Sequence, residues 1–276
     1  MSNDVEVPAH ELDFPDAQGE FEFTKKLVGQ VASHIHKVTT NLGADFDFAM
    51  DLLGFAAALQ RPAVEVVEAA RSVAEIGVAL FQRGSVGPDV TVTLSLAGTT
   101  VDVQGGVNYY NSAPRWLRAM GAAMALRDRA AIESLSRFDP GDFEGKYDPH
   151  HDMFVRALVA LHRNDAAVGE LLATAQREAQ SAKLFPELAR RIDMPLIGLA
   201  QAIVAGNADH IQQHLVEGLT WYRAIHQRKG ASHYAQAMVP LRFVGLCALA
   251  HDRGLPVHVR SRYLPSCLVD GNLDGA

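Results

Sequence analysis

The spacing of apolar residues predicts a mainly helical protein. Apolar side chains recur at steps of three or four from Phe23 to Val38, which places them on one helix face. Similar patterns cover 45–59 and 62–81, and Pro62 suits the first turn of a helix. We therefore expect the first third of the chain to consist of amphipathic helices packed on one another.

In one segment of the chain, apolar residues recur at every second position. Apolar and polar residues alternate over Val90–Leu96 and again over Thr99–Val103, with Ala97-Gly98 between them. This alternation around a short Gly-containing turn predicts a β-hairpin over about 90–103. A two-stranded ribbon is only marginally stable alone in water. We expect it to lie on the helices or to project as an arm for another protein.

Helical patterns resume after the hairpin and continue almost to the end of the chain. Ser112 is a candidate N-cap for a helix that carries Trp116, and further helices are expected at 151–162, 165–183, 186–191, 195–204, 209–229 and 240–251. The Pro- and Gly-containing segment 138–151 is a possible subdomain joint. The predicted fold is a multi-helix bundle or a helical-hairpin array with one small β-hairpin. Residues 1–20 are expected to form an acidic N-terminal arm, and 21–276 a single helical domain.

Charge is distributed unevenly along the 276 residues. The chain has 32 Asp+Glu and 25 Lys+Arg, and seven of the acids precede residue 23 without any base, so the remainder holds 25 acids and 25 bases. A formally neutral body lacks the clustered positive charge that nucleic-acid binding requires. Nor does any apolar run approach the ~18 residues of a membrane span. With only Cys247 and Cys267, the sequence fits a cytoplasmic protein with reduced thiols.

Two groups of polar residues have the chemistry of metal ligands. Asp148, His150, His151 and Asp152 are the densest, but their spacing matches no familiar metal site, and Asp148-Pro149 is more typical of a helix start. His210 and His214 are four residues apart with Glu217 beyond them, although the metalloprotease pattern requires Glu where Ile211 stands. Neither a Gly-rich phosphate loop nor a nucleophile motif is present. We therefore predict no enzyme activity, cofactor or bound metal.

Aromatic residues beside the hairpin suggest a contact surface. Tyr109 and Tyr110 are adjacent, so at most one of them faces inward on an extended segment, and the other is a candidate anchor for a partner. Trp116 lies on the apolar stripe of its helix and is more typical of the core.

The order of these motifs is distinctive. It runs from Ile76-Gly77-Val78-Ala79-Leu80-Phe81 through the hairpin and a Gly/Asn/Tyr link to Trp116-Leu117-Arg118-Ala119, Ala125-Leu126-Arg127-Asp128-Arg129 and Leu135. In this order and spacing the chain resembles the immunity protein 49 family of bacterial polymorphic toxin systems, over roughly 62–271. The closing Val257–Pro265 is similar to the end of that family, although Arg262 stands where an acidic residue is common.

The resemblance implies a mainly helical immunity protein without catalytic residues. We expect it to bind a cognate toxin domain in the cytoplasm and block its active site, with a role in bacterial competition. The candidate partner-binding residues are Tyr109, Tyr110, Asp148, His150, His151, Asp152 and Arg262. Two alternatives remain open: an enzyme that reverses the modification made by the toxin, with a metal at Asp148–Asp152, and a helical-hairpin scaffold that binds peptides in a concave groove. The sequence leaves the oligomeric state open.

Overall fold

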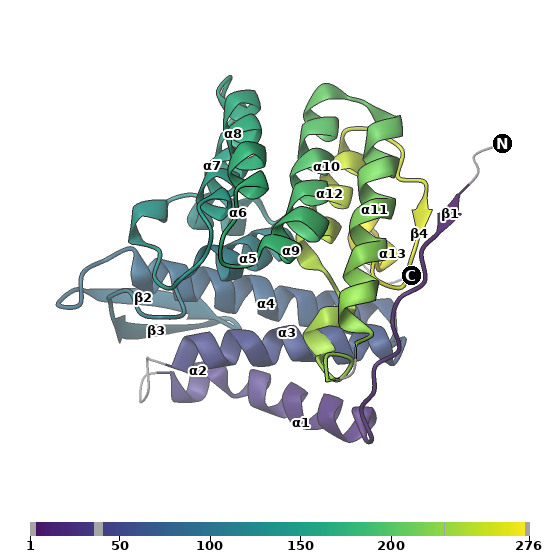
Figure 1. The fold of residues 1–276 in the computed structure, drawn as a ribbon. Helices are drawn as coiled ribbons and strands as arrows, with labels where there is room; N and C mark the ends of the chain where they lie inside the picture. Colours follow the sequence, from purple (N-terminus) through teal and green to yellow (C-terminus); the bar gives the residue numbers. More distant parts are fainter. Residues whose placement is uncertain (1–3, 36–40, 229, 274–276) are drawn as a thin grey trace.

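A computed structural model describes residues 4–35, 41–228 and 230–273, and it confirms the mainly helical fold. Helices α1 (Ala17–Gly29), α3 (Leu42–Ala58) and α4 (Ala63–Gly84) lie side by side as a layer (Figure 1). The helix expected from Phe23 to Val38 is interrupted at Gln30, directly after Gly29, a poor helix former, and α2 (Val31–His34) follows. Val38 lies outside the described residues.

The predicted hairpin is present as β2 (Thr91–Leu96) and β3 (Thr99–Gln104). Both turn residues, Ala97 and Gly98, have positive φ values of 47° and 72°. That backbone twist matches the twist of the two strands. Leu94 and Val103 are buried, and β2 packs on α4, so the hairpin lies on the helices.

After the hairpin come α5 (Ala113–Ala125) and the short α6 (Arg129–Leu135), which are followed by the remaining elements. They are a 3-10 turn η2 (Pro140–Asp142), α7 (His150–His162), α8 (Val168–Gln180), α9 (Pro186–Leu188), a π-helical segment η3 (Ala189–Asp193), α10 (Met194–Ala205), α11 (Ala208–His226), a 3-10 turn η4 (Ala235–Met238), α12 (Leu241–Asp252) and α13 (Ser266–Val269). In Figure 1, α7 and α8 form one upright group and α10, α11 and α12 another, both above the layer of α3 and α4. Within the described ranges, no helix is both long and apolar enough to cross a membrane.

The N-terminal segment is held against the end of the chain. β1 (Val5–Glu6) pairs in parallel with β4 (Val259–Arg260), and the N–H of Val5 donates to the carbonyl of His258 at 2.9 Å. Asp4 forms an ion pair with Arg260 at 2.7 Å. Figure 1 shows both termini on the same side of the molecule. Local sequence patterns favoured an irregular arm because pairing across the whole length of the chain leaves no periodic signal.

The core contains the residues expected there. Trp116 is fully buried, and its indole N–H donates to the carbonyl of Leu135 at 3.0 Å. Phe138 and Phe143, from the segment 138–151, pack against Phe81 with ring centroids 5.0 and 6.2 Å away. These contacts tie the segment to α4, and the subdomain joint stays a prediction.

Two glycines allow α5 and α12 to cross at close range. A Cβ added to Gly121 would lie 2.3 Å from the carbonyl oxygen of Leu241, and one added to Gly245 would lie 2.7 Å from that of Gly121. Real Cβ atoms do not approach backbone oxygens so closely, so the crossing requires glycine on both helices. Arg118 precedes Gly121 by three residues and Arg242 precedes Gly245 by three. Each arginine therefore lies one turn before the crossing point, on the same side of its helix as the glycine.

Gly121→Ala should lower the free energy of unfolding by about 2 to 3 kcal/mol, because backbone must move to admit the methyl group. Gly169→Ala on α8 is the matched control, since nothing lies within 4 Å of its added Cβ. The control should be neutral or stabilising by about 0.5 kcal/mol, owing to the better helix propensity of alanine. Urea unfolding measures both, and equal effects would contradict a crossing that depends on Gly121.

Candidate functional site

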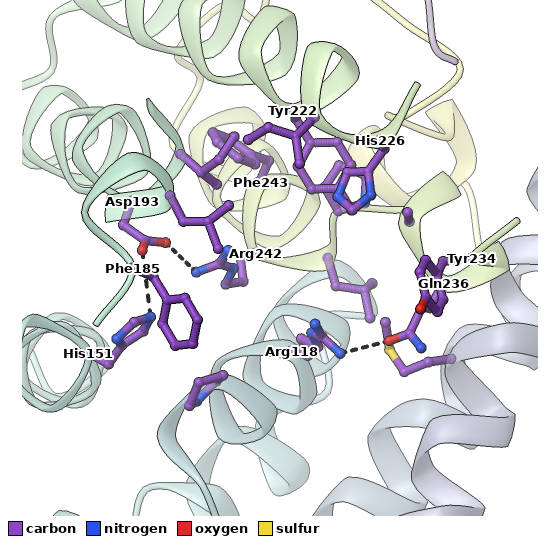
Figure 2. A pocket seen from close by; sticks show the side chains of 18 of the residues that line it. Arg118, His151, Phe185, Asp193, Tyr222, His226, Tyr234, Gln236, Arg242 and Phe243 are labelled. Carbon is purple, nitrogen blue, oxygen red and sulfur yellow. Dashed lines mark hydrogen bonds and ion pairs between the residues drawn. The ribbon is translucent and has the colours of Figure 1, made fainter. Parts of the chain in front are cut away.

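A cavity of about 520 Å³ opens beside the crossing of α5 and α12. Arg118 of α5, Asp193 of η3 and Arg242 of α12 contribute charged groups to its lining. Aromatic side chains form much of the remaining wall, and these are Tyr147, Phe185, Tyr222, Tyr234 and Phe243. Figure 2 shows Arg118 and Arg242 between Phe185 on one side and Tyr234 on the other. The cavity thus combines guanidinium groups with apolar walls, which is typical of a site for an organic anion.

The carboxylate of Asp193 is the centre of a buried polar cluster. Arg242 Nη1 donates to Oδ1 at 2.7 Å, and His150 Nε2 lies 3.0 Å from Oδ2, the distance of a hydrogen bond in which the ring donates. Burial alone would raise the pKa of Asp193, but the Arg242 guanidinium and the His150 hydrogen bond hold it well below its usual range. Asp193 is therefore a fixed negative charge that neutralises Arg242.

Asp193 occupies the end of the π-helical segment. The wider turn of a π-helix often occurs at functional sites. Here it joins α9 to α10 and presents the carboxylate to α7 and α12.

His151 lies next to this cluster in its neutral form. Burial lowers its pKa to about 4, against the attraction of Asp193. Its Nδ1 lies 3.2 Å from the carbonyl oxygen of Asp148, so Nδ1 carries the proton that it donates. Its Nε2 then has a lone pair and lies 3.6 Å from Asp193 Oδ2. A neutral His151 adds no positive charge to the cavity.

His150, His151 and Asp193 also meet the geometric condition for a metal site, since one ligand atom from each lies within 4.8 Å of the others. Two imidazoles and a carboxylate are the ligand types of zinc sites. However, Arg242 already binds the carboxylate, and a divalent cation would add two further positive charges beside Arg242 and Arg118. The charges of the cavity therefore favour an anion over a metal ion.

Arg118 has a different environment from Arg242. Its Nη1 donates to the side-chain oxygen of Gln236 at 2.8 Å, as Figure 2 shows. Among the described residues, no carboxylate oxygen lies within 4.0 Å of its guanidinium, whereas Arg242 is paired. Burial lowers the pKa of Arg118, and the nearby Arg242 charge lowers it further, yet an arginine stays protonated at neutral pH. The cavity therefore contains a cation without a carboxylate in direct contact, and the carboxylates of Asp47 and Asp51 act on it only at longer range.

The other candidate ligands of the first group lie apart from the cluster. The Asp148 carboxylate accepts backbone N–H bonds from Lys183 and Leu184 at 2.8 and 3.1 Å. Asp148 thus anchors the loop before α9. The expected helix start at Asp148-Pro149 is confirmed, because α7 begins at His150 with Pro149 as its N-cap, but the Asp148 side chain does not provide the cap. Asp152 instead hydrogen-bonds Tyr147, and burial raises its pKa. The structure brings His150 and His151 to the cavity without these two acids.

The remaining partner-binding candidates lie elsewhere. Tyr109 is 70% exposed, while Tyr110 is half-buried with Arg115 above its ring at 4.9 Å. As expected, one tyrosine of the pair faces solvent. Arg262 pairs with Glu11 of the N-terminal segment.

The second group of candidate ligands does not assemble. The rings of His210 and His214 have centroids 6.2 Å apart, and His214 packs on Gly198, where burial lowers its pKa. His210 and Glu217 are exposed, whereas His214 is half-buried.

Three principal residues of the cavity escaped the sequence analysis, namely Arg118, Asp193 and Arg242. Arg118 and Arg242 are each flanked by apolar residues, in Trp116-Leu117-Arg118-Ala119 and Leu241-Arg242-Phe243-Val244, and Asp193 directly precedes an apolar run that begins Met194-Pro195-Leu196. A charge in such a run is expensive to bury without a role or a partner, so this is the signal that marks them.

A known protein family matches the part of the chain that carries the charged residues of the cavity. The family Immunity protein 49 matches residues 56–268, which is most of the chain. The chain belongs to this family. The match includes Arg118, Lys146, Asp193 and Arg242, all the Lys, Arg, Asp and Glu residues that line the cavity, while the N-terminal segment and α1 precede it. No curated protein and no solved structure matches the chain.

Removing the charge of Arg118 and removing that of Arg242 should change the free energy of unfolding in opposite directions. Arg118→Met should raise the free energy of unfolding by about 1 kcal/mol, because it removes a desolvated charge that has no carboxylate in direct contact. Arg242→Met should lower it by about 3 kcal/mol, because Asp193 then stays buried without its partner. Urea unfolding distinguishes the two, and equal destabilisation would contradict the difference in pairing.

Stability should fall as pH decreases from about 6.5 to 4. Burial, with the charges of His10 and Arg118, lowers the pKa of His226 to about 4, while an unfolded histidine titrates near 6.5. In this range the unfolded chain binds more protons, so acid favours unfolding. His226→Gln should reduce the loss of stability between pH 7 and pH 5 by about 1 to 2 kcal/mol.

Exposed His210→Gln is the control for this measurement and should leave the slope unchanged. Asp51 changes the pH dependence of stability in the opposite direction, because burial raises its pKa to about 6. Its contribution is the same in all variants. Chemical unfolding at a series of pH values measures the slopes, and identical slopes for His226→Gln and the wild type would contradict the assignment.

Proposed function

We propose that this protein is an immunity protein that binds a cognate toxin domain in the bacterial cytoplasm and neutralises it by occluding its active site. Membership of the Immunity protein 49 family carries this proposal, because the family name denotes such a role. Inhibition by occlusion requires no catalytic group on the inhibitor. It requires a surface of about 800 Å² per partner with well-placed anchor residues.

The mouth of the cavity has the properties of such a surface. Leu184, Phe185, Leu188 and Tyr234 are exposed by 48, 55, 40 and 50%, and the last three also line the cavity. Exposed apolar groups gathered around a hollow mark protein interaction sites more often than scattered ones. We name these four residues the mouth cluster and propose that the toxin covers them.

Co-expression with the toxin tests the proposal. The C-terminal domain encoded by a neighbouring toxin-like gene is expressed in a bacterium with and without this protein. Growth rescue together with a stoichiometric complex on size-exclusion chromatography is the expected result. If no complex forms and no rescue occurs with that toxin or any toxin recovered by pull-down, the proposal is wrong.

A second candidate function is suggested by His150, His151 and Asp193. An enzyme that reverses the modification made by the toxin would use this cluster, and it would rescue growth without a stable complex. Size-exclusion chromatography of the co-expressed proteins separates the two functions, because a binding protein protects only through a stable complex, whereas an enzyme protects without one. Several peptide partners in the pull-down, in place of one dominant protein, would favour a peptide-binding scaffold.

Substitutions at exposed aromatic residues should locate the toxin surface. Phe185→Asp and Tyr234→Asp should each weaken toxin binding at least 30-fold, as loss of a hot-spot residue does. Phe23→Asp on α1 is the control, because Phe23 is equally exposed at 57% and lies outside the mouth cluster.

Tyr109→Asp tests the alternative surface beside the hairpin. Biolayer interferometry gives the four dissociation constants. A large effect at Tyr109 with none at Phe185 or Tyr234 would move the interface to the hairpin and refute the mouth cluster.

A further inference from the structure

We propose that the cavity receives a carboxylate group, supplied by an acidic side chain that the toxin inserts through the mouth cluster to reach Arg118. This inference rests on the proposed function and specifies the chemistry by which the toxin is recognised. It follows from the charge of the cavity, the free donors of Arg118 and the apolar surface around the opening.

The lining of the cavity carries an excess of positive charge. Arg118, Lys146 and Arg242 are the cations, and Asp193 is the carboxylate that faces them. Asp193 is engaged by Arg242 at 2.7 Å, so Arg118 and Lys146 remain without a carboxylate within 4.0 Å in the described part of the chain. Lys146 is exposed, whereas Arg118 lies deeper. Inside the cavity, Arg118 is therefore the cation that a ligand can contact directly, since Asp47 and Asp51 act on it only at longer range.

Arg118 keeps most of its hydrogen-bonding capacity. A guanidinium has five N–H donors, and among the described residues Arg118 uses one of them, toward Gln236. Gln236 is itself fixed, because its backbone N–H donates to Asp51 at 3.3 Å. The free donors form the planar fork that binds a carboxylate through two parallel hydrogen bonds. The hydrogen bond to the fixed Gln236 holds Arg118 in position before a ligand arrives.

The groups around Arg118 suit a single carboxylate better than a phosphate. Burial raises the pKa of Tyr222 to about 12, so its hydroxyl stays protonated and able to donate. His226 is neutral at pH 7 and adds no charge. A doubly charged phosphate would leave one negative charge uncompensated at this depth, and that charge would be costly to desolvate.

The surroundings of the opening favour a protein as the source of the carboxylate. A free small anion needs only the cavity, whereas the mouth cluster adds exposed apolar area outside it, from Leu184 to Tyr234. An acidic side chain on a protein surface would occupy the cavity while its neighbours cover this rim. Arg118 and the acidic side chain would then form a buried charge contact surrounded by apolar residues, which is the arrangement found at interaction hot spots.

Competition by a small carboxylate tests the inference on the wild-type chain. Phenylacetate is the probe, and phenylacetamide, which has the same shape without the charge, is its control. Phenylacetate should bind with a dissociation constant of about 1 mM, measured by isothermal titration calorimetry, and phenylacetamide at least tenfold more weakly. Phenylacetate, but not phenylacetamide, should also displace the toxin. Equal binding of the two compounds would overturn the inference, because it would show that the charge is not recognised.

Variants of the full chain locate the contact. Arg118→Gln should weaken both phenylacetate and toxin at least tenfold, and Arg118→Lys, which retains the charge without the fork, should restore part of the loss. Arg71→Gln is the matched control, since Arg71 is an exposed arginine on α4. Toxin binding that is unchanged in Arg118→Gln overturns the inference and leaves the proposed function intact.

A wild-type chain that binds no toxin would instead refute the proposed function, and with it the toxin as the source of the group. The phenylacetate comparison would then decide the chemistry alone. If the wild type prefers phenylacetate to phenylacetamide and Arg118→Gln does not, the cavity is a carboxylate site for a free small molecule. If the wild type binds the two compounds equally, the carboxylate site is refuted. Since the first comparison uses only the wild type, failure of a variant to fold does not remove the test.

Discussion

The close approach of α5 and α12 is the constraint on which the site depends. Gly121 and Gly245 let the two backbones meet at a distance that no side chain permits. Arg118 and Arg242 stand one turn before these glycines, so the crossing that forms the core also sets the two guanidinium groups beside one cavity. Moving the helices apart would separate the two arginines. The same helix crossing therefore determines both the packing of the core and the geometry of the site.

Electrostatics distinguishes the two arginines that this crossing brings together. Arg242 has a buried carboxylate partner, supported by His150, and that cluster connects α7, η3 and α12. Arg118 has an amide partner and remaining donors directed to the cavity. A desolvated charge without a carboxylate in direct contact lowers stability, and proteins retain such groups mainly where function requires them. On this reasoning Arg118 is a binding group and Arg242 a structural one.

The sequence predicted the elements better than the site. Periodicity identified the helices and the β2–β3 hairpin, because each buries one face against its neighbours. It did not reveal that Val5-Glu6, in an otherwise irregular N-terminal segment, pairs with a strand some 250 residues away, because local patterns do not record such a pairing. The dense Asp148–Asp152 motif contributed His150 and His151 to the cavity, but Asp148 serves the backbone of the loop before α9. The decisive charges are isolated in apolar helices, so only the fold shows that they meet.

Hydrogen–deuterium exchange on the chain with and without its cognate toxin tests the central claim most directly. The account predicts that the toxin slows exchange around the cavity opening, in 184–193 and 234–243, because these segments carry the mouth cluster and its supporting turns. It also predicts little change in the hairpin at 91–104. Protection confined to the hairpin, or no protection despite a stable complex elsewhere on the surface, would contradict the assignment of the cavity as the toxin-binding site.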